Sequence, residues 1–551
     1  MKDKNKIYNS MVINTSIAIF FIILSVVSLY FSHIYNFRMV TGDDYQFHAV
    51  RIEGLYEALR SHVYFPRINM TFMHSMGYAT SIFYSDVYLY FPAVLRLLGF
   101  SLAESYVIFL VFVNFLTFVI SYFSMMNIEK KISKSLIFSL LYTLSFYRLF
   151  DLTGRAALGE TLAMSFLPLA FMGLYHILYK NKNKWYFMTI GISLIIYAHM
   201  LSTIMFGLAV FVFLLINIKK LYYDRERLKC FIKSVLVIIP LVAFSLVPIL
   251  EQMHSQKFVV TILVFHVSKY AKNLGGLVTD SLSNTPLTSN LGVVLLIFLI
   301  IYLFSIRKLK NRSTRDIFIV GLIFLLLTTS LFPWKIAERT FLHTIQFPWR
   351  FISIVTLCLC WIIAEDSLKL LKSKRITSVL LFLVILLSVS YSINCSERSR
   401  KVFKYTQLDH INTDYIGGAE YLPEKAHYTT LKNTKLDLLY NKKDIDIKNY
   451  TKNRDTIIFD FKTTNRQSVT LPLIYYKGYV SQLTGRGTVS EPFLNRGQEA
   501  GLISVIVKGE GRVKVYYRET VLQAASKYVS LASWIIFLFY LLVIRKKTDS
   551  N

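Results

Sequence analysis

The sequence predicts a mainly α-helical, polytopic membrane protein of about 12 spans, with a small β-rich domain on the outer face of the membrane. Of its 551 residues, 54% are hydrophobic and 15% are aromatic, a composition that is typical of membrane proteins. Apolar runs recur along the chain, and clusters of lysine and arginine occupy every second connection between them. We therefore expect a multi-pass protein of the cell membrane.

The apolar runs predict the positions of the spans, because about 20 apolar residues in a row are enough to cross a bilayer. The first run, Met11 to about His33, follows three lysines as a signal peptide would, but no small-residue cleavage pattern comes after it. We therefore expect an uncleaved first span. The other runs begin near Glu104, Ser135, Leu162, Trp185, Ser202, Phe231, Leu291, Ile317, Phe351, Thr377 and Tyr528.

The basic clusters predict the orientation, because cytoplasmic loops are the ones rich in lysine and arginine. Twelve spans with both termini in the cytoplasm require seven such clusters, the number that the sequence contains. The net charge of +29 does not indicate nucleic-acid binding, because the basic residues form no separate domain. The clusters are Lys2 to Lys6, Lys130 to Lys134, Lys180 to Lys184, Lys219 to Lys233, Arg307 to Arg315, Lys369 to Arg375 and Arg545 to Lys547.

Two connections on the predicted outer side are long, and they set the expected domains. The first outer loop comprises residues 34–103 and belongs with a membrane region of residues 1–393. Residues 394–527 alternate apolar and polar side chains and contain a glycine-rich, hairpin-like turn, which predicts a β-rich domain. The last transmembrane helix and a basic cytoplasmic tail form residues 528–551.

The first outer loop carries the richest group of polar side chains. A helix that starts near Asp43 would place Asp44, His48 and Arg51 on one face, at positions i, i+4 and i+7. A carboxylate beside an imidazole and a guanidinium can act as a general base or as half of a metal site. Asp44, Asp43 and His48 are therefore catalytic candidates, and a divalent metal ion is possible. The alternative is that one of the two acids only caps the helix.

The same predicted helix has an apolar side, formed by Ile52, Leu55, Tyr56 and Leu59. An apolar side on a helix of the outer loop favours contact with lipid. We therefore expect this helix to lie flat on the outer surface of the membrane.

Further ionisable residues lie where predicted spans end on the outer side, and charges in the middle of spans are nearly absent. A proton- or ion-coupled transporter should place some of them near the bilayer centre, whereas an enzyme that works at the outer surface needs them at this rim. Each residue alone could be an interfacial anchor. The candidates for substrate binding are Arg51, Arg155, Glu160, His199, Trp349 and Arg350.

Three short motifs carry a family resemblance: Gly42-Asp43-Asp44 with His48, Phe65-Pro66-Arg67, and Gln346-Phe347-Pro348-Trp349-Arg350. On these motifs the chain resembles the bacterial multispanning membrane family named for a 6-pyruvoyl-tetrahydropterin-synthase-related domain. That family is itself similar to the GT-C class of membrane glycosyltransferases. The pterin part of the name finds no support in the residues, because a pterin synthase needs a zinc-binding histidine cluster on a soluble fold.

The resemblance implies a reaction and a set of partners. In GT-C enzymes an acid of the first outer loop activates the acceptor, which would be Asp44 or Asp43 here, and the donor is a polyprenyl-phosphate sugar. Arg155 or Arg350 would bind the donor phosphate. The expected function is sugar transfer from this lipid-linked donor to a cell-envelope acceptor, at the outer face and among membrane lipids. The alternative is a non-catalytic envelope-assembly or lipid-handling protein with the same architecture.

Overall fold

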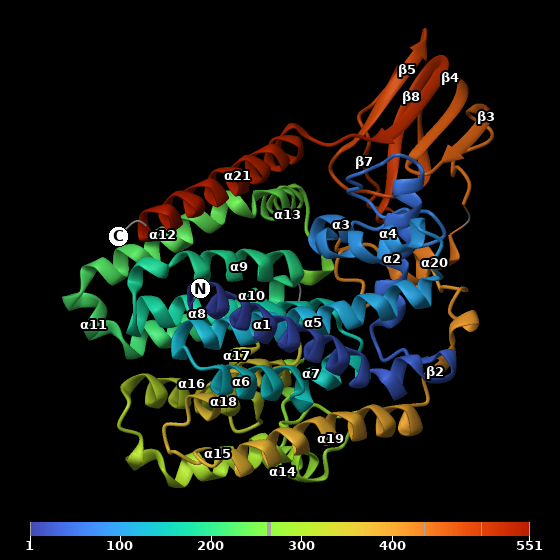
Figure 1. The fold of residues 1–551 in the computed structure, drawn as a ribbon. Coiled ribbons are helices and arrows are strands. Elements are labelled where there is room, and N and C mark those ends of the chain that lie inside the picture. Colours follow the sequence, from blue (N-terminus) through green and yellow to red (C-terminus); the bar gives the residue numbers. More distant parts are fainter. Residues whose placement is uncertain (1, 262–265, 435, 498, 550–551) are drawn as a thin grey trace. The chain divides into compact units, whose positions relative to one another are not determined.

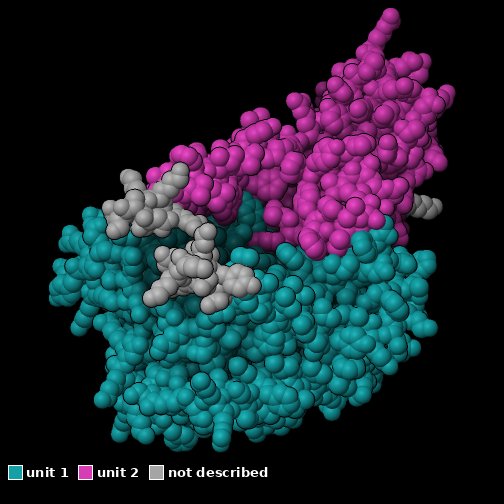
Figure 2. All heavy atoms as spheres, viewed as in Figure 1, with its two compact units in different colours: residues 1–45, 99–238, 265–410 teal, residues 46–98, 239–264, 411–551 magenta. Residues whose placement is uncertain are grey.

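A computed structural model describes residues 2–261, 266–434, 436–497 and 499–549, and the fold is mainly helical with one larger β-sheet. The chain forms two compact units (Figure 2). The first unit comprises residues 1–45, 99–238 and 265–410, and the second comprises residues 46–98, 239–264 and 411–551. The first outer loop is thus divided between the two units, whereas the sequence placed all of it with the membrane region.

The first unit is a bundle whose centre is formed by α8 (Leu158–Tyr179) and α18 (Ile352–Glu365) (Figure 1). Every residue of α8 from Leu158 to Leu178 is buried, because helices pack around it on all sides. Its other helices are α1 (Lys2–Val27), α5 (Leu102–Glu129), α6 (Ile132–Thr143), α7 (Phe146–Leu149), α9 (Tyr186–Ala198), α10 (Met200–Ile216), α11 (Ile218–Tyr223), α12 (Arg225–Leu241, which continues into the second unit), α14 (Leu274–Ser283), α15 (Gly292–Phe304), α16 (Arg312–Thr328), α17 (Trp334–Ala337) and α19 (Lys374–Arg398).

The prediction of a multi-pass membrane protein is confirmed at the level of its apolar helices. Among the described residues, 5 helices are long and apolar enough to cross a membrane, or up to 8 if each bent pair of helices counts as one span. A helix lies at each of the twelve predicted places, but several, including α9 and α15, are too short to pass on their own. The number of 12 spans and the cytoplasmic termini therefore stay predictions.

A break between α6 and α7 shapes the interior of the first unit. Ser145 has an extended backbone, which ends α6 and bends the two helices by 45°. A π-helical turn, Phe150–Gly154, follows α7 directly. Such turns occur frequently at functional sites. Here the turn leaves Asp151 completely buried.

The second unit contains the predicted β-rich domain. Its strands run antiparallel in the order β3-β4-β8-β5 (Figure 1), and β6 and β7 also pair with β8. The buried face of this sheet packs on side chains of the first outer loop, such as Phe72 and Tyr78. The elements are α2 (Tyr45–Arg60), α3 (Thr80–Phe83), α4 (Tyr90–Leu97), α13 (Ala243–Ser255), α20 (Tyr428–Asn433), α21 (Val521–Asp549), β3 (Asp446–Asn453), β4 (Thr456–Ile474), β5 (Tyr479–Gly485), β6 (Thr488–Val489), β7 (Phe493–Leu494) and β8 (Leu502–Tyr517).

The prediction that the apolar side of α2 faces lipid is wrong for Ile52 and Leu55, whereas Tyr56 and Leu59 are half-buried. Ile52 and Leu55 are almost fully buried inside the protein. The reason is that the rest of the first outer loop folds over the helix: Asn69 donates to the Val50 carbonyl, and Arg96 pairs with Glu53 at 3.0 Å. Ile52 and Leu55 are therefore part of a protein core.

Candidate functional site

Five charged side chains of the first unit form one connected group, which we call the Arg155 cluster: Asp44, Asp151, Arg155, Glu160 and Arg350. Nη1 of Arg155 donates to Asp151 Oδ1 at 2.6 Å and to Glu160 Oε2 at 3.0 Å. Its Nη2 lies 3.4 Å from Asp44 Oδ2. Nε of Arg350 lies 3.4 Å from Glu160 Oε2. One guanidinium thus connects three carboxylates, and the second guanidinium approaches the same glutamate.

The backbone fixes Asp44 beside this arginine. The N–H groups of Asp43 and Asp44 both donate to the carbonyl oxygen of Arg155, each at 2.8 Å. Gly42 has φ +60°, and a Cβ on it would lie 2.6 Å from the Arg155 carbonyl carbon. Only glycine fits such a close approach at this backbone angle. Gly42-Asp43-Asp44 therefore acts as a docking turn on Arg155.

The cluster has a buried interior and one exposed edge. The side chains of Asp151 and Glu160 are 0% and 1% exposed, whereas that of Asp44 is 37% exposed. Desolvation by the surrounding protein raises the pKa of Asp44, and the charges of Arg155 and Arg350 offset part of this increase. A carboxylate with a raised pKa is a stronger proton acceptor. Asp44 is thus both accessible and suited to act as a base.

Arg155 stays charged in this environment. Burial alone would lower its pKa, but the carboxylates of Asp151, Glu160 and Asp44 raise it overall. The guanidinium is therefore a permanent cation next to Asp44. Its N–H groups already donate to three carboxylates.

The motif Gln346-Phe347-Pro348-Trp349-Arg350 supplies one wall of the cluster. The Trp349 ring lies 4.6 Å from the guanidinium carbon of Arg155, and Phe347 stacks on Trp349 with 5.3 Å between ring centroids. Nη1 of Arg350 donates to the Ile345 carbonyl at 3.1 Å and to Gln346 Oε1 at 3.0 Å. The motif therefore holds Arg350 in place and covers Arg155 with an aromatic ring.

The structure brings together most of the residues that the sequence singled out. Asp44, Arg155, Glu160, Trp349 and Arg350 share the site just described. Asp43 is their neighbour, 66% exposed, and pairs with Lys401 at 2.7 Å.

Three other candidates have partners elsewhere. In the second unit, Arg51 is buried and donates to the Tyr84 carbonyl at 2.7 Å and to Asp86 Oδ1 at 2.9 Å. His48 is buried as well, with Nδ1 3.3 Å from Arg51 Nη1. His199, at the start of α10, lies 2.8 Å from the Ser202 hydroxyl. These contacts give structural roles to Arg51 and His199. The expected role of His48 in catalysis and those of Arg51 and His199 in substrate binding stay predictions.

Sequence reasoning gave no role to Tyr147 and did not select Asp151. The Tyr147 hydroxyl donates to Glu160 Oε1 at 2.7 Å, and Asp151 binds Arg155. The signal was present, because Tyr147, Asp151 and Arg155 follow one another at intervals of four residues, which places them on one helical face. The break at Ser145 obscured this helix.

The acids of the cluster do not suit a divalent metal ion. Among the described residues, no group of three or more histidine, cysteine, aspartate or glutamate side chains is placed to hold one. Asp44, Asp151 and Glu160 instead surround Arg155, and a cation in that position repels a metal ion.

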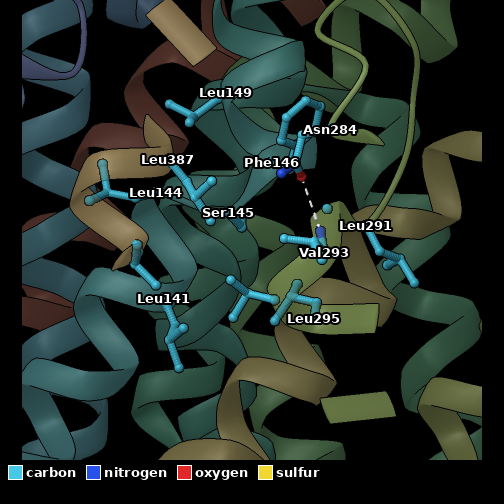
Figure 3. Close-up of a pocket in the computed structure, with 13 residues that line it drawn as sticks. Leu141, Leu144, Ser145, Phe146, Leu149, Asn284, Leu291, Val293, Leu295 and Leu387 are labelled. Atoms are coloured by element: carbon cyan, nitrogen blue, oxygen red, sulfur yellow. Dashed lines mark hydrogen bonds between the residues drawn. The ribbon is translucent and has the colours of Figure 1, made fainter. Parts of the chain in front are cut away.

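A second candidate in the first unit is a mostly apolar pocket beside α7 (Figure 3). Leu141, Phe146, Leu149 and Leu291 line it, and Asn284 Oδ1 accepts a hydrogen bond from the Val293 N–H at 3.0 Å. Its volume of about 40 Å³ is the space of a few water molecules and is too small for a sugar. The Arg155 cluster is therefore the better candidate for chemistry.

Comparison with known proteins gives three findings. An uncharacterized protein of Lactococcus lactis subsp. cremoris (strain MG1363) is 24% identical over 589 residues, covering 96% of this chain and 95% of that protein. The solved structure of the arabinofuranosyltransferase AftD from Mycobacteria matches with a TM-score of 0.43 and 14% identity over 72% of this chain, which spans 27% of AftD. Residues 68–412 match the family described as bacterial membrane protein YfhO.

The expectation of a bacterial membrane-protein family is confirmed, although the matching family is not the one named for the pterin-synthase-related domain. The match covers more than half of the chain. This protein therefore belongs to the bacterial membrane protein YfhO family.

Proposed function

We propose that this protein is a GT-C-type membrane glycosyltransferase that moves a sugar from a polyprenyl-phosphate-linked donor to a cell-envelope acceptor at the outer face. The observation that carries the proposal is the placement of Asp44. It is the one carboxylate of the Arg155 cluster with substantial exposure, and it lies 3.4 Å from a buried guanidinium. An acid of the first outer loop is also what the resemblance to GT-C enzymes implies for the base.

The reaction assigns a role to each part of the site. The acceptor hydroxyl oxygen attacks the anomeric carbon of the donor sugar, and the bond from that carbon to the phosphate oxygen breaks. Asp44 accepts the hydroxyl proton, and the phosphate leaves with the electron pair. Arg155 already donates hydrogen bonds to all three carboxylates of the cluster. Its role is therefore to hold Asp44 in position and not to bind the phosphate. Arg350 is the better candidate for the leaving phosphate, since it approaches only Glu160 among these acids.

The test is glycan analysis of the cell envelope in a deletion strain that carries the wild type, Asp44→Asn or Asp43→Asn. Asparagine keeps an oxygen that can accept from Arg155, so the Asp44→Asn protein should fold and insert. It cannot accept the proton, and sugar transfer should fall by about 100-fold or more. Asp43→Asn is the matched control, because Asp43 is exposed and pairs only with Lys401 among the contacts described. Its glycan level should stay near that of the wild type.

Two results would contradict this proposal. Wild-type glycan levels with Asp44→Asn would exclude Asp44 as the base and favour the non-catalytic alternative. In vitro, the rate should fall as the pH drops through the pKa of Asp44, because only the carboxylate form accepts a proton. Since that pKa is raised, the decline should begin at a higher pH than for an ordinary aspartate. A rate independent of pH across the acidic range would also exclude Asp44.

A further inference from the structure

Two short strands of the first unit form a ribbon that follows two candidate spans. β1 (Arg38–Val40) comes directly after the bent helix pair that ends at Phe37, and β2 (Val402–Lys404) follows α19, which ends at Arg398. The strands are antiparallel, with Arg38 opposite Lys404 and Val40 opposite Val402. Because both strands begin where candidate spans end, the ribbon belongs at the level of the membrane surface.

The ribbon places two like charges opposite each other. Directly opposed side chains in an antiparallel pair have Cβ atoms about 5 Å apart, and like charges there destabilise the pair. Arg38 and Lys404 are both exposed. Within the part of the chain that the structure describes, neither has a carboxylate within ion-pair distance. An anion between them would remove the repulsion.

In the larger sheet of the second unit, directly opposed charged residues of β4 and β8 carry opposite charges. Asp460 stands opposite Arg512, and their side chains are 2.6 Å apart. Lys462 stands opposite Glu510 at 3.0 Å. The pairing of Arg38 with Lys404 therefore differs from the pattern elsewhere and indicates a partner that the chain itself does not supply.

Exposed aromatic side chains near the ribbon favour a lipid as that partner. Tyr35, Phe37 and Phe403 are 50%, 73% and 39% exposed, and the Phe37 ring packs edge-on against Tyr405 with centroids 6.0 Å apart. Aromatic residues at the end of an apolar span are typical of the membrane interface. Lipid phosphate groups lie at the same level of the membrane.

We propose that Arg38 and Lys404 together bind the phosphate of an anionic membrane lipid. Two adjacent cations can share one phosphate through charge-assisted hydrogen bonds. The ribbon also leads to the Arg155 cluster, because the Thr41 N–H donates to the Lys401 carbonyl at 2.9 Å just before Gly42-Asp43-Asp44. A bound lipid thus stabilises the strands that lead to Asp44. This lipid site does not depend on the proposed sugar transfer.

The experiment measures lipid selectivity of the purified full-length protein, in lipid nanodiscs that contain fluorescent phosphatidylglycerol or phosphatidylcholine. The wild type should prefer phosphatidylglycerol. Arg38→Gln with Lys404→Gln should reduce this preference by about 25-fold, since each cation near an anionic lipid contributes about fivefold. The matched control, Lys448→Gln with Arg466→Gln, removes the same charge from exposed positions of the second unit and should keep the preference. Equal preference in the ribbon variant and the control would overturn the proposal.

A second variant covers the case in which the double variant does not fold. Lys404→Glu creates an opposite-charge pair with Arg38, so it should raise the melting temperature without phosphatidylglycerol and abolish the preference for this lipid. Unchanged lipid preference in Lys404→Glu would contradict the site. Displacement of the fluorescent lipid by inorganic phosphate at equal concentration would show a site for free phosphate and would also overturn the proposal.

Discussion

The two ends of the central helices α8 and α18 carry two different polar groups. The Arg155 cluster lies at one end, with Glu160 on the first turn of α8 and Arg350 just before α18. At the other end, Glu365 accepts hydrogen bonds from Tyr175, Trp361 and Thr314 at 3.0, 3.1 and 2.8 Å, and we call these residues the Glu365 group. Both groups belong to the first unit and contain a buried glutamate.

The difference between them separates a structural site from a chemical one. Both carboxylate oxygens of Glu365 accept hydrogen bonds from neutral donors. Glu365 is only 7% exposed, so the Glu365 group is fully hydrogen-bonded and shielded from solvent. The Arg155 cluster contains three acids and two arginines, and Asp44 leaves one edge open. Satisfied polar networks make a core specific and rigid, whereas an open, charged edge can exchange protons with a substrate.

The largest expected effect is the loss of Arg155. Arg155→Met leaves Asp151 and Glu160 buried around an apolar side chain, and removing one partner of a buried ion pair costs about 3–5 kcal/mol. The free energy of unfolding, measured by denaturant titration in detergent, should fall by this amount. Arg350→Met is the matched control and should cost less, because Glu160 keeps its hydrogen bond to Arg155. Equal losses would show that Arg155 is not the centre of the cluster.

A smaller effect is expected in the Glu365 group. Glu365→Gln keeps the shape but turns an NH₂ toward one of the donors, and a buried donor without an acceptor costs about 1–3 kcal/mol. The same denaturant titration should show this loss. The proposed sugar transfer, measured per folded molecule, should stay at the wild-type level, because Glu365 only holds helices together. A loss of transfer as large as that expected for Asp44→Asn would place Glu365 in the mechanism and end the distinction between the two groups.

The sequence predicted the helices and the sheet well because both depend on local patterns. Long apolar runs became helices, and alternating residues such as those of β4 and β8 became the larger sheet. The compact units could not be predicted, because they join residues 46–98 to residues 411–551 across hundreds of positions. Neither hydropathy nor turn signals carry information on such distant packing.

The candidate site was predicted only in part, because local patterns in the sequence do not show which distant residues pack together. The positions of Arg155, Glu160 and Arg350 beside helix ends followed from the ends of the apolar runs. The grouping of Asp44 with His48 and Arg51 relied on helix spacing alone, but the helix begins at Tyr45, and Arg51 pairs with Asp86. Asp44 instead docks on Arg155 through a loop, which helical periodicity cannot show.

Buried arginine marks a further limit of sequence reasoning. Arg148 is 0% exposed, and its guanidinium donates to Asn114 Oδ1 at 2.6 Å and to Thr117 Oγ1 at 2.7 Å. These partners lie in the middle of α5, whereas the sequence predicts almost no charges in the middle of spans. The side chain reaches there from α7, so its depth in the bundle depends on tertiary packing rather than on position in an apolar run.

The smallest effect is expected for the surface pair of Asp43 and Lys401. These side chains are 66% and 51% exposed, and an exposed ion pair contributes about 0–1 kcal/mol. Lys401→Gln should therefore change the free energy of unfolding by less than about 1 kcal/mol, and the difference should shrink further as salt is added.

The proposed sugar transfer should survive this substitution as well. The contact that holds Thr41 uses the backbone carbonyl of Lys401, which glutamine retains, so the turn at Gly42 should still dock Asp44 on Arg155. The measurement is envelope glycan content together with unfolding at low and high salt. A loss of transfer with unchanged stability would mean that the exposed pair contacts the substrate itself. In that case the substrate-binding part of the Arg155 cluster would include Asp43 and Lys401 as well as Asp44.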